Sequence, residues 1–346
     1  MPRSERPLAL ARWLLLVAAL VAAIVAVGGI TRLTESGVSI TEWQPVTGAL
    51  PPLTEAAWQA EYAKYRQTPQ YIRVNGPAGM TLATYKTIFF WEWVHRLLAR
   101  TIGIALGLVT AWYAWRGWIP RGYLPRLIAL IALIALQAAI GWWMVQSGIV
   151  NDVKVSHYRL AAHLLTALLT LAGLVWTALD LVAHASGKPP RRLAPFAAAA
   201  MATLFVQLGF GALVAGLRAG QVANDWPLMQ GRWFPDGVNW SHGLLPALLN
   251  DPYLTHFVHR WWAWVVVAVL VVMGRKLRRA GARPASIAVH SAFGVQVLLG
   301  IATAMTGVAL WVAVLHQLVG ALLVAAATWG AHVLSARPAA LQARAG

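Results

Sequence analysis

Eight long runs of apolar residues alternate along this chain with short segments that hold most of its charged residues. Each run has at least 20 residues, the length that an α-helix needs to cross the hydrocarbon core of a bilayer. Backbone amides and carbonyls inside hydrocarbon must bond to one another, and a helix does this within a single segment. The pattern therefore predicts an all-α, polytopic membrane protein. Its expected transmembrane helices lie at residues 10–30, 88–115, 122–147, 157–183, 193–216, 254–273, 284–307 and 310–334.

The positions of the charges decide what the strongly basic composition means. A net charge of +17 is typical of proteins that bind nucleic acid. If the N-terminus lies in the cytoplasm, however, the inner segments carry a balance of +14 and the outer ones only +3. This is the positive-inside pattern, so we expect cytoplasmic N- and C-termini, contact with membrane lipid and no nucleic-acid partner.

The first apolar run follows Arg3, Arg6 and Arg12, as the hydrophobic part of a signal peptide would. No small-residue cleavage site precedes the Gly28–Gly29 pair, so we expect a retained first helix. The sequence has no cysteine, which excludes disulfides, thiolate metal ligands and covalent Cys-x-x-Cys haem attachment.

Three pairs of segments resemble each other and indicate an internal repeat of four helices. The pairs start at Gln137 and Gln296, at Gly29 and Gly216, and at Glu92 and His256. Since four helices return the chain to its starting side, the halves should be related by a pseudo-twofold axis along the membrane normal. We expect two tandem four-helix bundles, 1–190 and 191–346. A long outer loop at 31–87 is expected to contain a short helix at 53–65.

Four of the ten histidines lie five to seven residues into the four helices that are expected to run inward. They are His95, His163, His259 and His316. At 1.5 Å per residue they lie about 8–10 Å below the outer boundary, two in each bundle. The other histidines, His332 among them, lie near helix ends or in loops, where an interfacial polar role is the simpler interpretation.

Two imidazoles at one depth on facing helices are typical axial ligands of haem iron. A Zn²⁺ or Cu²⁺ site would want a third or fourth ligand, which a chain with no cysteines and few carboxylates supplies poorly. A single intramembrane histidine is as often an interhelical hydrogen-bonding residue. Four at a common depth across a repeat favour two haem sites, because ionisable groups inside membranes usually serve function.

Glu92 lies one turn before His95 and should face the same site, where a buried carboxylate can exchange protons. The alternative is a structural ion pair with Arg96, four residues later. The second half keeps the arginine, as Arg260, but has His256 in place of the acid. This difference favours a reaction site in the first half and an electron-relay site in the second.

Arginines near the outer helix ends are candidate partners of haem propionates, to which a guanidinium offers a bidentate, permanently charged group. They are Arg32, Arg96, Arg159, Arg218 and Arg260. Snorkelling of these side chains to the membrane interface is the alternative interpretation.

Several segments together resemble the haem A synthase family of cytochrome oxidase assembly proteins. They are GGITRLTESGVSITEWQPVTGALPP, YKTIFFWEWVHRLLARTIG, SHYRLAAHLLTAL, NDWPLMQGRWFP, HFVHRWWAW and LHQLVGALL. The resemblance covers essentially the whole chain. Because the sequence has no cysteine, it is similar to the cysteine-free branch found in proteobacteria and mitochondria.

The resemblance implies a role for each histidine pair. His95 and His163 would flank the substrate, haem O, with Glu92 as the acid needed for turnover. His259 and His316 would bind a haem b cofactor. The implied reaction oxidises the C8 methyl of haem O to a formyl group by successive hydroxylation and loss of water.

The resemblance also implies the protein's surroundings. They are the bacterial inner membrane with haem sites toward the periplasm, haem O from haem O synthase, an external electron donor, and O₂ or water as oxygen source. Whether the protein is a monomer or a homo-oligomer stays open.

From the residues alone, two other classes of protein also fit histidine pairs in a membrane bundle. The first is a di-haem b-type electron-transfer protein, such as a quinol or ferric reductase. Its haems usually lie near opposite membrane faces, whereas all four histidines here share the outer depth. The second is a haem transporter, which would use the same ligands without needing Glu92.

Overall fold

The computed structural model describes residues 5–44, 47–150 and 152–336, and the regular structure of these residues is helical. Eight of the described helices are long and apolar enough to cross a membrane. They are α1 (Pro7–Leu33), α3 (Leu82–Arg116), α4 (Leu124–Val150), α5 (His157–Ala185), α6 (Pro195–Leu217), α8 (Pro252–Arg279), α9 (Arg283–Met305) and α10 (Leu310–Leu334). The predicted fold class, an all-α protein with eight membrane spans, is confirmed.

Local sequence explains where several of these helices begin. Proline stands in the first turn of α1, α6, α8 and α9, where a missing backbone N–H removes no helical hydrogen bond. At the start of α8, the Asp251 side chain accepts a hydrogen bond from the Leu254 amide at 2.9 Å. The two non-membrane helices are α2 (Glu55–Tyr65), which was expected, and α7 (Leu244–Asn250).

Helix α3 begins at Leu82, six residues before the predicted start at 88. Thr81 and Thr84 form a capping box there, and Tyr85 and Phe89 pack in an aromatic cluster with α2 instead of facing lipid. An apolar-run criterion misses this turn because its polar residues face the outer loop. The predicted spacing of five to seven residues from the helix start is therefore wrong for His95, which lies 13 residues after Leu82.

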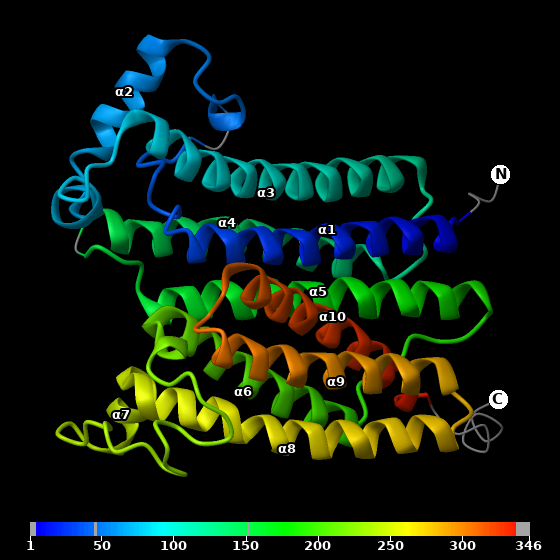
Figure 1. Cartoon of the computed structure of the whole chain (residues 1–346). Helices are drawn as coiled ribbons and strands as arrows, with labels where there is room; N and C mark the ends of the chain where they lie inside the picture. The colour runs from blue at the N-terminus through cyan, green and yellow to red at the C-terminus, as the bar shows by residue number, and fades with distance from the viewer. Residues whose placement is uncertain (1–4, 45–46, 151, 337–346) are drawn as a thin grey trace.

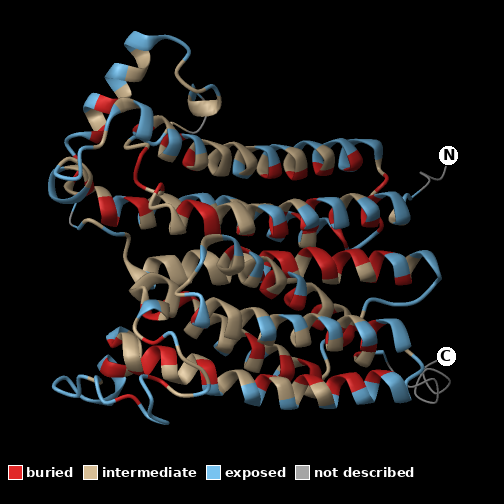
Figure 2. Cartoon of the chain, viewed as in Figure 1, coloured by how far each residue is buried: buried red, intermediate tan, exposed pale blue. Residues whose placement is uncertain are grey.

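The two halves of the chain share one hydrophobic core. Helices α1, α5, α6 and α10 pack together in the middle, α3 and α4 pack outside α1 and α5, and α8 and α9 pack outside α6 and α10 (Figure 1). The distribution of buried residues agrees with this packing: they gather along the inner faces of α1 and α5, while few residues of α4 and α9 are buried (Figure 2). The predicted boundary at residue 190 stays a prediction, because the central helices of both halves form a single packed layer.

Both ends of the described chain lie at one end of the bundle, and α2 and α7 lie at the other (Figure 1). The first outer segment is held by stacked tyrosines: the rings of Tyr65 and Tyr85 lie 5.1 Å apart, and Tyr85 donates a hydrogen bond to the Ser39 carbonyl at 3.1 Å. The outer loop is therefore a packed structure on top of α3.

A buried ionic cluster joins the halves at the terminal end of the bundle. The carboxylate of Asp180 in α5 is fully buried and lies 2.9 Å from Nε2 of His332 in α10. It also accepts hydrogen bonds from the Arg126 guanidinium at 2.5 Å and the Arg191 backbone N–H at 3.0 Å. An interfacial role for His332 is therefore wrong: its side chain is buried in a contact between residues 152 positions apart.

Candidate functional site

The first predicted histidine pair is brought together between α3 and α5. The ring centroids of His95 and His163 lie 6.4 Å apart. Two imidazoles that bind one metal ion, each nitrogen roughly 2 Å from it, place their ring centroids on the order of 6 Å apart. The separation therefore fits two axial ligands of a single iron.

The second pair, His259 of α8 and His316 of α10, lines a cavity between α6, α8, α9 and α10. Its volume is about 270 Å³, close to the lower end of the roughly 300–1,000 Å³ that is typical of cavities that hold ligands and cofactors. Arg32 and Arg218 lie at the same cavity, which places an arginine of α1 beside the histidines of the second half.

The donor set at both sites suits haem better than a small ion. Among the residues with described structure, no group of three or more His, Asp or Glu side chains is arranged to hold one metal ion. Pairs of histidines are the arrangement that a porphyrin needs, since its own four nitrogens complete the coordination.

Each of the four histidines packs against a glycine of the preceding transmembrane helix. The partners are Gly28 with His95, Gly141 with His163, Gly211 with His259, and Gly300 with His316. A Cβ atom built on these glycines would lie between 3.0 and 3.3 Å from the histidine ring. The absence of a side chain therefore gives each imidazole the room to stand against its neighbouring helix.

Buried polar atoms without hydrogen-bond partners provide a further test of whether these histidines suit a haem iron. Nδ1 of His163 and Nδ1 of His316 have no hydrogen-bond partner, although both atoms are buried. A histidine that binds metal through Nε2 carries its proton on Nδ1 and normally donates it to a neighbouring acceptor. The nearby glutamines Gln137 and Gln296 each have a buried, unpartnered Oε1. The described residues thus fit Nε2-ligating histidines, with acceptors available beside them.

Glu92 is buried and forms the ion pair that was the alternative to a catalytic role. Its carboxylate lies 2.6 Å from the Arg96 guanidinium. It also accepts hydrogen bonds from Ser39 Oγ at 2.7 Å and from the Ile40 amide at 2.8 Å. The acid one turn before His95 is thus tied to the first outer segment, and its role in the reaction stays a prediction.

Arg96 and Arg260 hold the two outer loops by equivalent hydrogen bonds. Arg96 donates to the carbonyls of Ile40 at 2.7 Å and Glu42 at 2.9 Å, and Arg260 donates to those of Ala223 and Asp225, both at 2.9 Å. In each half the second carbonyl belongs to an acidic residue that precedes a tryptophan. These matching contacts agree with the predicted repeat, and they direct both guanidinium groups at backbone oxygens.

The other three predicted arginines have different surroundings. Arg32 donates to the Ala215 carbonyl of α6, and Arg218 pairs with Glu35, so the two side chains cross between the halves in opposite directions. Arg159 donates to the Trp143 carbonyl at 2.6 Å and stacks on that indole. Arg32 and Arg218 are among the predicted propionate partners that line the second cavity. They bond to α6 and to Glu35 instead of to carbonyls of the outer loops.

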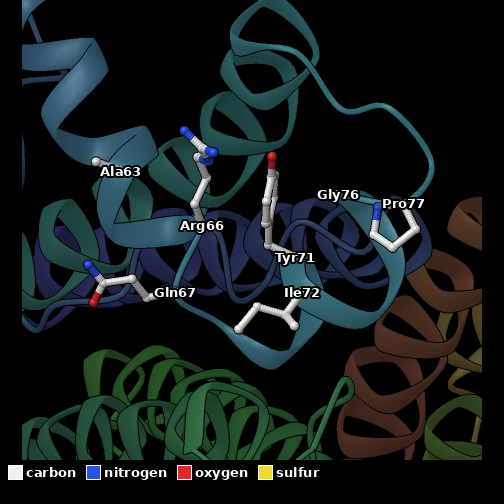
Figure 3. A pocket seen from close by; sticks show the side chains of 7 residues that line it. All are labelled: Ala63, Arg66, Gln67, Tyr71, Ile72, Gly76 and Pro77. Atoms are coloured by element: carbon white, nitrogen blue, oxygen red, sulfur yellow. The ribbon is translucent and has the colours of Figure 1, made fainter.

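A second hollow lies on the outer loop, away from the histidines. Figure 3 shows its lining between Ala63 and Pro77, where Arg66 and Tyr71 stand side by side. Its lining residues belong to the end of α2 and to the segment that follows it, so it is part of the loop surface and not of either histidine pair.

Sequence reasoning missed the glutamines beside the histidines. Gln137 donates to the His163 carbonyl at 2.8 Å, and Gln207 donates to the His259 carbonyl at 3.0 Å. A usable signal was present, since glutamine stands four residues before the packing glycine in α4, α6 and α9. The predicted repeat rests on this glutamine only at Gln137 and Gln296.

Eight helices that can span a membrane, with two histidine pairs among them, define the class of this chain as a polytopic membrane protein. The sequence pattern of the cytochrome oxidase assembly protein family matches residues 11–328, so this chain belongs to that family. The family resemblance predicted from the sequence is confirmed.

Curated relatives agree over nearly the full length. The chain is 67% identical to Heme A synthase of Novosphingobium aromaticivorans over 337 residues, which is 95% of this chain and 96% of the relative. It is 57% identical to Heme A synthase of Sphingopyxis alaskensis, covering 97% of this chain and 95% of the relative. It is 51% identical to Heme A synthase of Rhizorhabdus wittichii, covering 96% and 95%.

Proposed function

We propose that this chain is a haem A synthase, which oxidises the C8 methyl group of haem O to a formyl group. Two hydroxylations of the methyl carbon give a geminal diol, and loss of water leaves the aldehyde. The observation that carries this proposal is the asymmetry between two otherwise similar sites. Each has a histidine pair and a loop-binding arginine, but only the first has a carboxylate, Glu92, one turn from a histidine.

In this proposal the first half, 1–190, binds the substrate and the second half, 191–346, binds a cofactor. His95 and His163 would hold haem O by its iron. His259 and His316 would hold haem b, with Arg32 and Arg218 near its propionates. Haem b supplies one-electron transfer when it is bound.

Glu92 is the residue that we assign to proton handling at the first site. Its carboxylate accepts from Ser39 and Arg96, so it is held in one orientation beside His95. A fixed, buried carboxylate can accept a proton released near the reacting methyl group. Arg96 and Ser39 would hold the carboxylate in place during this transfer.

We further infer that the haem sites face the periplasmic side of a bacterial inner membrane. The end of the bundle with both chain termini carries the larger positive balance, which marks a cytoplasmic surface. Haem O would arrive from haem O synthase through the membrane, electrons from an external donor, and oxygen from O₂ or water.

The natural absence of cysteine makes this orientation directly measurable. Single cysteines at Gln67 and Lys188, both exposed, lie at opposite ends of the bundle. A membrane-impermeant maleimide added to intact spheroplasts should label Gln67→Cys and leave Lys188→Cys unlabelled until the membrane is opened. The reverse labelling pattern would overturn the assignment.

The activity is tested by expressing the protein with a haem O source and identifying the extracted haems by chromatography and mass. Haem A, or its hydroxylated precursor, is the expected product. Recovery of haem b and unchanged haem O under aerobic conditions would instead support the di-haem electron-transfer alternative. A variant that has lost both first-site histidines, His95→Ala with His163→Ala, is the control, because it should keep haem b and form no product.

A further inference from the structure

The four histidine–glycine contacts share one more position, which is four residues before each glycine on the same helix face. The residues at this position are Ile24 in α1, Gln137 in α4, Gln207 in α6 and Gln296 in α9. Three of the four histidines therefore have a glutamine beside them. The exception is His95, whose neighbouring helix has isoleucine there, packed against the main hydrophobic core.

The glutamines contact the histidine-bearing helices through their amide groups. Gln207 is the fullest case: its Nε2 lies 3.0 Å from the His259 carbonyl and 3.1 Å from His259 Nδ1. Gln137 donates to the His163 carbonyl at 2.8 Å. The Gln296 amide lies beside Gly320, one turn after His316, at 3.3 Å from a Cβ built on that glycine.

In each of these three pairs the Oε1 atom of the glutamine is buried without a partner. Two of the three histidines also have a buried, unpartnered Nδ1, and these are His163 and His316. A glutamine whose Oε1 accepts from Nδ1–H satisfies both atoms at once. A hydrogen bond from Nδ1–H fixes the ring so that Nε2 faces the metal.

His95 differs from the other three in ring orientation as well as in its neighbour. The atoms of His95 nearest to a Cβ on Gly28 are Nε2 at 3.3 Å and Cδ2 at 3.5 Å. In the other three pairs the nearest ring atom is Cε1, at 3.0 or 3.1 Å, followed by Nδ1. His95 thus turns its Nε2 edge toward the neighbouring helix, and isoleucine offers it no hydrogen bond.

We propose that Gln137, Gln207 and Gln296 are positioning residues that keep their histidines on iron, and that His95 is the ligand that leaves the iron of the substrate. The iron–Nε2 bond of His95 breaks, an exogenous ligand takes the vacated position, and no electron is transferred in this exchange. The second site, with a glutamine beside both of its histidines, keeps six-coordinate iron suited to electron transfer alone. The proposal rests on the proposed function for the identity of the first haem.

Carbon monoxide reports this difference without any turnover. The protein is loaded with haem O under anaerobic conditions and reduced with dithionite, and CO binding is followed by difference spectroscopy. We expect the haem of the first site to bind CO and that of the second to stay six-coordinate. Ile24→Gln should weaken CO binding at the first site about tenfold, the equilibrium effect of one buried hydrogen bond. Ile24→Leu, which keeps the apolar character, should bind CO like the wild type.

The opposite substitutions test the glutamines. Gln296→Leu should make the second haem reactive to CO, and Gln137→Leu should strengthen CO binding at the first. These variants also cover the case in which Ile24→Gln does not fold. CO binding that is the same in Ile24→Gln and Ile24→Leu, or a Gln296→Leu protein whose second haem ignores CO, would overturn the proposal.

The two proposals fail in different ways. If no haem A forms in the product assay but the CO pattern holds, the proposed function fails and the ligand assignment stands. If haem A forms and CO binding does not respond to Ile24 or Gln296, the ligand assignment fails alone.

Discussion

At the scale of single residues, the two histidine sites differ most at Glu92 and His256. Both side chains lie one turn before a histidine that we propose as a haem ligand, and both contact the arginine four residues later. Arg96 and Ser39 hold the Glu92 carboxylate in place. His256 instead accepts a hydrogen bond at Nε2 from the Arg260 guanidinium at 3.0 Å, and it has no carboxylate.

Replacing Glu92 by glutamine keeps the size of the side chain and removes the acid. We expect Glu92→Gln to retain haem b and to lower formation of the formyl product by about 100-fold or more, the usual contribution of a general acid–base group. The measurement is the ratio of haem A to haem O in extracts.

Ser39→Ala is the matched control for that variant. It removes one hydrogen bond to the same carboxylate but keeps the acid and the Arg96 pair. If Ser39→Ala loses product as fully as Glu92→Gln, the carboxylate acts by holding the outer loop in place.

At the scale of elements, the outer loops are fixed to α3 and α8 by arginine and tyrosine side chains. Arg260 reaches three backbone carbonyls of the second loop, those of Ala223, Asp225 and Leu228. In the first loop, the tyrosines of α2 and α3 pack against one another and help to hold the loop on α3. Both loops are thus fixed to the helices that carry His95 and His259.

Substitution of Arg260 by lysine should loosen the second loop. One ammonium group cannot reproduce the planar fork that binds three carbonyls, so some of these buried oxygens would lose their donor. We expect Arg260→Lys to speed limited proteolysis between residues 222 and 243 several-fold. Arg232→Lys, at an exposed ion pair with Asp236, serves as the control and should leave cleavage unchanged.

The first loop should loosen at high pH. Burial raises the pKa of Tyr65 to about 12, from an ordinary value of 10.0. Because the folded-state pKa is the higher one, the stabilisation is complete below pH 10 and is lost as the pH rises from 10 to 12. Hydrogen exchange of residues 66–81 should accelerate across this window.

Tyr65→Phe distinguishes this cause of loosening from general alkaline unfolding. The variant has no phenol to ionise, although it also loses the hydrogen bond to Gln70. Its loop exchange should be faster at neutral pH and should show a smaller change between pH 10 and 12. An identical pH profile in both proteins would remove Tyr65 from the explanation.

At the scale of the whole molecule, contacts that cross between the halves hold the two bundles together. At the outer end Arg32 reaches α6, Arg218 reaches Glu35, and Gln317 of α10 donates to the Val25 carbonyl of α1 at 2.9 Å. At the terminal end the Asp180–His332 pair joins α5 to α10. The halves that carry the two histidine pairs are therefore joined at both ends of the bundle.

Removing the carboxylate of Asp180 should destabilise the protein more than any exposed ion pair. Asp180→Ala would leave His332 and the Arg126 guanidinium without their buried partner, and such losses cost about 3–5 kcal/mol. Thermal unfolding in detergent should show a clearly lowered midpoint. Glu55→Ala, which breaks the exposed pair with Lys86, should shift it little.

Hydrophobic patterning was sufficient for the fold class and for eight spans, because the length and apolarity of a membrane helix are local properties of the chain. The end of α10 and the start of α5 agree with the predicted ranges, and α2 was expected within two residues of its start. The start of α3 was not predicted correctly, because the capping box and the tyrosine contacts that extend this helix involve the outer loop.

The sequence by itself also singled out the four histidines as candidate ligands, although the spacing used for His95 depended on a helix start that lies six residues earlier in the structure. Only the tertiary structure decided which groups surround them. Hydrogen bonds such as those of Gln137 to His163 and Arg96 to the outer loop join residues 26 and 56 positions apart. The pair of Asp180 with His332 spans 152. Such contacts depend on which helix faces meet, and helix packing sets this in three dimensions without leaving a local pattern.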